Sequence, residues 1–131
     1  MDFVTAVKMV LGKYATFSGR AKRPEFWWFV LFVILAGLVV GILDAMLFGA
    51  SDAASAAAGY SVQSEPLSAL FALAVFLPYL AVAVRRLHDI DKSGWWVLIG
   101  LIPLVGWIVL LIFYVRRGTE GDNRFGPEPA A

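Results

Sequence analysis

The sequence predicts an all-α, polytopic membrane protein, and three observations lead to this prediction. First, the 131 residues are 60% hydrophobic and only 16% charged, whereas soluble proteins contain about 25% charged residues. Second, none of the eleven Lys and Arg residues lies in residues 24–84 or 93–115. Third, those two intervals contain nearly all of the apolar sequence. Cations that flank apolar runs are typical of the cytoplasmic ends of membrane helices.

The composition also excludes several kinds of site. The chain has no cysteine and one histidine, so disulfides, thiolate metal sites and thiol catalysis are excluded. We expect neither a bound metal nor a cofactor. The cations form no basic stripe of the kind that binds nucleic acid. The length allows one domain at most, which we place at residues 1–129.

Residues 2–15 are predicted to form an amphipathic helix, because their apolar side chains recur at helical spacing and Lys8 and Lys13 lie off that stripe. Such a helix lies either on the membrane surface or packed against the other helices, and we favour the surface position. Pro24 then suits the first turn of the next helix, where its missing N–H is not needed.

Two apolar segments are long enough to be full spans. Residues 26–48 can cross a hydrocarbon core of about 30 Å at 1.5 Å per residue, and residues 66–84 form the second predicted span. Gly37 and Gly41 make a GxxxG step in the first span, which permits close helix approach. The intervening residues 49–65 contain no Lys or Arg and are predicted to form an external loop. The N-terminus is therefore predicted to be cytoplasmic, and the protein to cross the membrane more than once.

Residues 95–114 form a third hydrophobic element, which permits two interpretations. A single kinked span would place the arginines of the polar tail (residues 115–131) outside, against the positive-inside rule. Alternatively, Pro103 breaks the element into two halves that each reach only about 12–15 Å, so that they enter and return as a hairpin. Other helices must then bury the freed backbone groups. We favour the broken hairpin with a cytoplasmic tail.

This topology brings three polar strings to one membrane face, residues 18–25, 85–92 and 116–127. Each string mixes cations with carboxylates, whereas a topology signal needs only cations. The mixture indicates either an ion-pair network that holds the helix ends together or a pocket for an anionic ligand, because Arg pairs in bidentate fashion with carboxylate or phosphate. The candidate residues of this polar cluster are Arg20, Arg23, Glu25, Arg85, Arg86, His88, Asp89, Asp91, Asn123 and Arg124.

Two titratable features permit further interpretations. A carboxylate beside an imidazole can fix its tautomer, as in the pair His88-Asp89, but no nucleophile is evident. A polar loop is therefore favoured over a general base, and no catalytic residue is assigned. Asp44 is the ionisable residue inside a predicted span, where a charge is costly. It lies near the outer end of the span, which favours an interfacial role over a proton or ion path.

Three strings in combination resemble one bacterial family, the domain of unknown function 805 family. They are FSGRAKRPEFWWF (17–29), RRLHDIDKSGWW (85–96) and GTEGDNRFGPEP (118–129). The resemblance covers residues 1–129 and implies a small multi-span protein of the bacterial inner membrane, without implying an activity. The positions that match the family pattern are Phe17, Gly19, Arg20, Arg23, Glu25, Trp27, Arg85, Arg86, His88, Asp89, Gly94, Trp95, Trp96, Asn123, Arg124, Phe125, Gly126 and Pro127.

The favoured function is a structural or interaction module. Its cytoplasmic polar face would form an ion-pair network or bind anionic lipid or a partner protein, and a homo-oligomer is also open. One alternative is a small transport or channel-like component that uses Asp44 and the broken helix. The other is a membrane-embedded enzyme that acts on a lipid phosphate. We expect the lipid bilayer, and no nucleic acid, as a partner.

Overall fold

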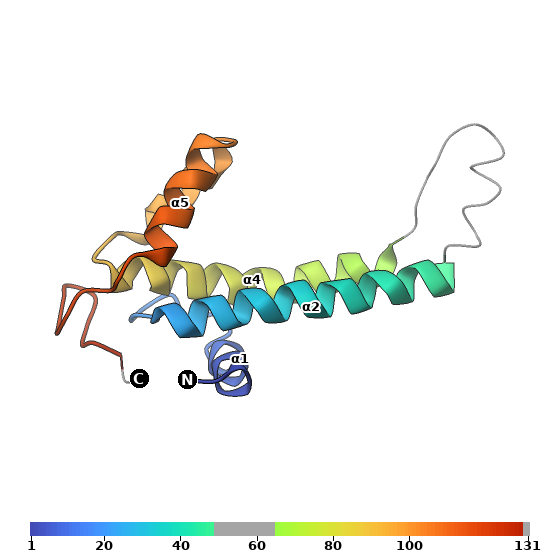
Figure 1. Ribbon diagram of the computed structural model, residues 1–131, viewed down its shortest axis with the longest axis horizontal. Coiled ribbons are helices and arrows are strands. Elements are labelled where there is room, and N and C mark those ends of the chain that lie inside the picture. The colour runs from blue at the N-terminus through green and yellow to red at the C-terminus, as the bar shows by residue number, and fades with distance from the viewer. Residues whose placement is uncertain (49–64, 130–131) are drawn as a thin grey trace. The chain divides into compact units, whose positions relative to one another are not determined.

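The computed structural model describes residues 1–48 and 65–129, and no β-strand occurs among them. The predicted all-α fold class is therefore confirmed. The predicted external loop, apart from Glu65, lies outside the described residues. In chain order the elements are α1 (Phe3–Gly12), α2 (Arg23–Phe48), α4 (Pro66–Asp89), the 3-10 helix η2 (Gly94–Leu101) and α5 (Val105–Val115) (Figure 1).

The chain divides into two compact units. The polar unit comprises Met1–Val30 and Leu77–Ala131, and the apolar unit comprises Leu31–Phe76. Both α2 and α4 contribute residues to each unit, and each unit is described by itself.

The helices α2 and α4 are long and apolar enough to cross a membrane, with mean hydropathies of 2.7 and 2.4 over 18 residues. Only 6% and 22% of these windows are buried, whereas the core helix of a soluble protein is mostly buried. Exposed apolar side chains of the apolar unit include Leu38 at 62%, Ile42 at 60% and Leu73 at 73%. Both predicted spans lie within these helices, and α4 continues past residue 84 to Asp89.

In the apolar unit, Asp44 near the end of α2 caps the beginning of α4. Its carboxylate accepts hydrogen bonds from the backbone N–H groups of Leu67 (3.0 Å) and Ser68 (2.7 Å). The first N–H groups of a helix have no intrahelical acceptor, and a carboxylate there also interacts favourably with the helix dipole.

The GxxxG step makes no tight crossing within this unit. A Cβ on Gly37 would be 3.7 Å from the Phe71 ring, and one on Gly41 would have no neighbour within 4 Å.

In the polar unit, α1 packs by one edge against the start of α2. Ala6 and Val10 are fully buried, and the Phe3 ring meets Trp28 edge-on with centroids 6.0 Å apart. The opposite edge leaves Val4 55% exposed. The helix thus packs against α2 on one side. Only the opposite side could contact the membrane surface, and that contact stays a prediction.

The third hydrophobic element is broken at Pro103, as predicted. Ile102 has extended backbone, which the following proline favours. Leu104 then adopts a positive φ of 66°, and the Val105 N–H donates to the Pro103 carbonyl at 2.8 Å. This γ-turn reverses the chain, so that η2 and α5 pack against each other. The closest approach is at Gly106, where a Cβ would collide with the Ile99 carbonyl oxygen.

Neither half of this hairpin can cross a bilayer. The 8 residues of η2 and the 11 residues of α5 each extend about 16 Å, about half of the hydrocarbon thickness of about 30 Å. Both ends of the hairpin lie at the end of α4: a Cβ on Gly94 would be 2.7 Å from Val84, and the Tyr114 carbonyl accepts a hydrogen bond from Arg86. The two halves therefore form a hairpin broken at Pro103, and its re-entry into the membrane stays a prediction.

Candidate functional site

The polar unit brings the three polar strings into contact at the end of α4. The Ala21 N–H donates to the Arg85 carbonyl at 3.0 Å, and the Thr119 N–H donates to the Asp89 carbonyl at 2.7 Å. The connector before α2 and the tail after α5 therefore both hydrogen-bond to the last turns of α4. Side chains then extend these two backbone contacts into a network.

Arg20 is the side chain that organises the C-terminal tail. Its Nε donates to Asp89 Oδ1 at 3.0 Å, and its Nη1 donates to the carbonyls of Gly121 (2.6 Å) and Gly126 (3.3 Å). Its Nη2 donates to the Thr119 carbonyl. The Gly126 carbonyl also accepts the Asn123 N–H of the tail itself at 3.0 Å. A guanidinium offers five donors in a rigid fork and can therefore bind several carbonyls at once. One buried cation, 1% exposed, thus holds three points of the tail.

Arg86 donates in the same way to backbone carbonyls at the end of α5. Its Nε donates to the Tyr114 carbonyl at 3.1 Å, and its Nη2 donates to the Arg116 carbonyl. The last carbonyls of a helix have no intrahelical donor. This fully buried guanidinium supplies donors that the next helical turn would otherwise have provided. Its Nη1 donates to Asp89 Oδ2 at 2.9 Å.

Asp89 joins the two arginines. One carboxylate oxygen binds Arg20 and the other binds Arg86, and the Asp89 side chain is 5% exposed. A buried ion pair is stable only where the remaining donors and acceptors are also satisfied, and here the tail carbonyls supply the other acceptors. Gly118 passes so close that a Cβ would collide with the Asp89 carboxylate.

Arg85 and Glu25 form a separate buried pair. Arg85 Nη1 lies 2.6 Å from Glu25 Oε1, and the side chains are 0% and 3% exposed. Glu25 is in the first turn of α2, where the helix dipole favours a negative charge. Arg85 Nε donates to the Thr16 carbonyl at 3.1 Å, which attaches the connector. Arg85 Nη2 is the buried side-chain polar atom that has no partner within the described part of the chain.

His88 packs between the connector and the tail, through contacts with Gly19 and Phe125. Its Nδ1 lies 2.9 Å from the Gly19 carbonyl, so Nδ1 carries the proton. Its ring stacks on Phe125 with centroids 4.0 Å apart and an interplanar angle of 3°. The Asn123 side chain donates to the His88 carbonyl at 2.9 Å. The adjacent Asp89 carboxylate binds the arginines described above, so the sequence neighbours His88 and Asp89 have separate partners.

Three of the predicted cluster residues lie at the exposed rim. Arg124 pairs with Asp91 at 3.1 Å, with side chains 62% and 49% exposed, and Arg23 donates to the Val115 carbonyl at 3.3 Å. The other seven lie in the network or against it. Asp44 belongs to the apolar unit, where it caps α4.

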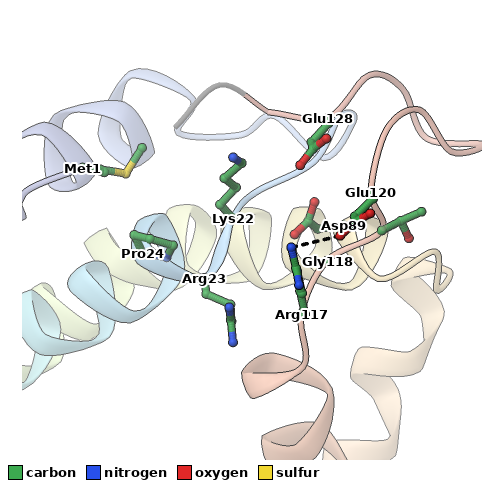
Figure 2. Close-up of a pocket in the computed structure, with 10 residues that line it drawn as sticks. Met1, Lys22, Arg23, Pro24, Asp89, Arg117, Gly118, Glu120 and Glu128 are labelled. Carbon is green, nitrogen blue, oxygen red and sulfur yellow. Dashed lines mark ion pairs between the residues drawn. The ribbon is translucent and has the colours of Figure 1, made fainter.

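A groove of about 310 Å³ opens beside the network (Figure 2). The cluster predicted from the sequence contains only two of its charged residues, Arg23 and Asp89. Of the others, Lys22, Arg117 and Glu120 lie in the polar strings, whose mixture of signs indicates a polar site, and Glu128 lies one residue beyond the last string. Within the described residues, no group of three or more His, Asp or Glu side chains could hold a metal ion. The charged side chains that line the groove are Lys22, Arg23, Asp89, Arg117, Glu120 and Glu128.

Comparison with known proteins identifies a family and relatives. The family model described as "Protein of unknown function (DUF805)" matches residues 14–127. Inner membrane protein YhaH of Escherichia coli (strain K12) is 44% identical over 120 residues, which is 92% of this chain and 92% of that protein. Inner membrane protein YhaI of the same strain is 42% identical over 120 residues, which is 92% of this chain and 91% of that protein. No solved structure matches the chain at a significant level.

Proposed function

This chain belongs to the DUF805 family, and we propose that it is a non-catalytic interaction module of the bacterial inner membrane. In this proposal α2 and α4 span the bilayer, and the N-terminus and the C-terminal tail are both cytoplasmic. The tail, held by the arginine network, forms a fixed polar face. That face contacts the phosphate-bearing lipid headgroups of the cytoplasmic leaflet.

The distribution of cations supports this orientation. Every Lys and Arg precedes residue 24 or follows residue 84, and the segment between the two long helices contains none. Short cytoplasmic loops carry an excess of Lys and Arg. The hairpin of η2 and α5 agrees with this orientation, because its halves are too short to carry the tail across.

The observation that carries the interaction role is the set of bonds from Arg20 to the tail. Polar chain ends are usually poorly ordered unless tied down, and ordering each residue costs about 1–2 kcal/mol of conformational entropy. A simple membrane anchor needs no ordered tail. Here a buried guanidinium binds the carbonyls of Thr119, Gly121 and Gly126, which gives the tail the fixed geometry that recognition requires.

The residues considered for catalysis and transport have other partners. The Nδ1 atom of His88 binds the Gly19 carbonyl, and the ring is covered by Phe125. The carboxylate of Asp44 binds two N–H groups at the start of α4. These contacts favour structural roles for both residues, and the interaction module remains the function that the geometry supports best.

A single introduced cysteine tests the orientation of the tail, because the chain has none of its own. In Pro127→Cys, a membrane-impermeant maleimide should label inverted vesicles and leave intact spheroplasts unlabelled. Labelling in spheroplasts would place the tail outside and contradict the proposal.

The role of the network is tested in the same background. Arg20→Lys keeps the charge but loses the fork, so trypsin should cleave after Arg124 faster than in the parent protein. Phospholipid added to the detergent-solubilised protein should raise the Tm of the parent, and Arg20→Lys should reduce this rise. An undocked tail with an unchanged lipid response would show that the polar face does not bind headgroups.

A further inference from the structure

We propose that the groove beside the network binds the headgroup of a phospholipid that carries a primary ammonium group, as a phosphoethanolamine headgroup does. The inference deepens the proposed function by naming the lipid class. It rests on that function in one respect: the docked tail forms one wall of the groove. The groove volume of about 310 Å³ is at the lower end of the range of about 300–1,000 Å³ for small-molecule sites.

One side of the groove offers cations for the phosphate. Lys22 is partly exposed and forms no ion pair with any described residue. Arg23 is exposed, and its side chain donates one hydrogen bond to the described part of the chain, to the Val115 carbonyl. Both come from the segment that enters α2, and Figure 2 shows them on the same side of the view as Pro24. Bonds between such cations and phosphate are charge-assisted and therefore about twice as strong as neutral ones.

The tail supplies carboxylates for the ammonium group. In Figure 2, Glu120 and Glu128 lie on the side of the view opposite to Pro24. Glu128 Oε2 accepts the Gly121 N–H at 2.9 Å, which fixes this carboxylate and leaves its second oxygen for a ligand. Glu120 pairs with Arg117, but both side chains are about three-quarters exposed, where such pairs contribute little. A headgroup with phosphate alone gains nothing from these carboxylates, whereas an ammonium group gains a partner.

The position of the groove favours a lipid over a soluble phosphate compound. Trp27 and Trp28 follow within the next turn of α2, and Trp residues are enriched at the headgroup level of membranes. A second groove of about 410 Å³, which is apolar, is lined by Phe26, Trp27 and Val30 together with residues of α4 and α5. The start of α2 therefore borders both a polar groove suited to a headgroup and an apolar one suited to a lipid chain.

Native mass spectrometry of the purified full-length chain tests the inference. Phosphatidylethanolamine, phosphatidylglycerol and phosphatidylcholine would be offered in equal amounts. Phosphatidylethanolamine should be retained about two- to fivefold over each of the others, the factor that one additional exposed ion pair provides. The trimethylammonium of phosphatidylcholine should bind less well, because it has no N–H to donate.

Matched variants separate the two halves of the groove. Glu128→Gln keeps an acceptor for Gly121 and should reduce the preference over phosphatidylglycerol to about one. Lys22→Gln should weaken both lipids together. Arg124→Gln, which removes an exposed cation that does not line the groove, should leave the preference unchanged.

Equal retention of phosphatidylglycerol, or an intact preference in Glu128→Gln, would overturn the inference. Soluble phosphoethanolamine that binds as tightly as the lipid would overturn the assignment to a membrane lipid. The rate of trypsin cleavage after Arg124 in the same preparations, compared with that in Arg20→Lys, separates the two proposals. A docked tail without lipid preference removes this inference alone, whereas an undocked tail in the parent protein removes the proposed function.

Discussion

The polar unit and the apolar unit bury charged side chains by different means. In the polar unit, Arg20, Glu25, Arg85, Arg86 and Asp89 are all buried and form three ion pairs. Among the described residues of the apolar unit, Asp44 is the one buried charged side chain, and its hydrogen bonds come from backbone N–H groups.

The difference follows from which backbone hydrogen-bonding groups need partners in each unit. In the tail, the connector and the end of α5, long arginine side chains donate hydrogen bonds to backbone carbonyls. The start of α4 leaves N–H groups without acceptors, and one carboxylate supplies them. Along the rest of the apolar unit the helices satisfy their own backbone, so apolar side chains can face lipid. Among the described residues, the buried arginines and Asp44 thus hydrogen-bond to backbone that is not in the middle of a helix, whereas the buried carboxylates of Glu25 and Asp89 pair with those arginines.

The largest expected effect is that of Arg86→Ala, which should lower the free energy of unfolding by about 3–5 kcal/mol, as for a buried pair that loses one partner. It leaves the carbonyls of Tyr114 and Arg116 without this donor. Unfolding in detergent followed by circular dichroism measures the loss. The control is Arg124→Ala in the exposed pair with Asp91, which should cost at most about 1 kcal/mol. Equal losses in the two variants would remove the distinction between network and rim.

Glycine substitutions should have opposite signs in the two units. Gly106→Ala should destabilise the hairpin by about 1–3 kcal/mol, the usual cost of overpacking, because the added Cβ meets the Ile99 carbonyl. Gly41→Ala has open space around it and should stabilise α2 by about 0.5–1 kcal/mol. Thermal unfolding of both variants measures this contrast. A destabilised Gly41→Ala would indicate that a neighbour packs on that face, as a second copy of the chain would.

The capping role of Asp44 predicts a moderate effect. Asp44→Ala should cost about 0.5–2 kcal/mol, as for other lost helix caps, and Asp44→Asn should cost less because its amide oxygen still accepts a hydrogen bond. Denaturant titration of the two variants separates an acceptor from a charge. An Asn variant that loses as much stability as the Ala variant would show that the negative charge itself is required.

The smallest effect concerns the start of α1. The Thr5 N–H donates to the Asp2 carboxylate at 2.8 Å, and this bonding lowers the pKa of Asp2 below its usual 3.8. The contribution to stability is therefore fully present above pH 3.8 and is lost as the pH falls through the lowered pKa. An NMR titration of the Thr5 amide should have its midpoint below 3.8. Asp2→Asn, which also caps helices well, should abolish the titration and keep the helix.

The sequence predicts the helices of this protein well because a bilayer leaves few alternatives. A long apolar run must satisfy its own backbone and therefore becomes a helix, as in α2 and α4. Pro103 predicts the break in the third element for an equally local reason. The extension of α4 to Asp89 is not predictable in this way, because Arg85 and Arg86 end an apolar run by composition and become buried only through their tertiary partners.

The sequence predicts which residues belong to the site, but it does not predict which of them pair with each other. The mixture of cations and carboxylates identifies the three strings, yet no local pattern indicates that Arg20 pairs with Asp89, 69 residues later. The groove residues Lys22, Glu120 and Glu128 resemble any polar loop in sequence. They face a common space only after the tail has docked, which depends on the whole fold.

The reach of the Arg20 bonds has a consequence for biosynthesis. Their acceptors in the tail lie 99, 101 and 106 residues further along the chain, so the ribosome makes these acceptors long after Arg20. Until residues 119–126 have been made and the tail has docked, Arg20 has none of its tail partners. A chain truncated before Thr119 would leave this guanidinium without them, and its half-life in cells should be shorter than that of the intact protein. The contacts of residues 119–126 therefore distinguish a chain with a docked tail from a nascent chain that still lacks it.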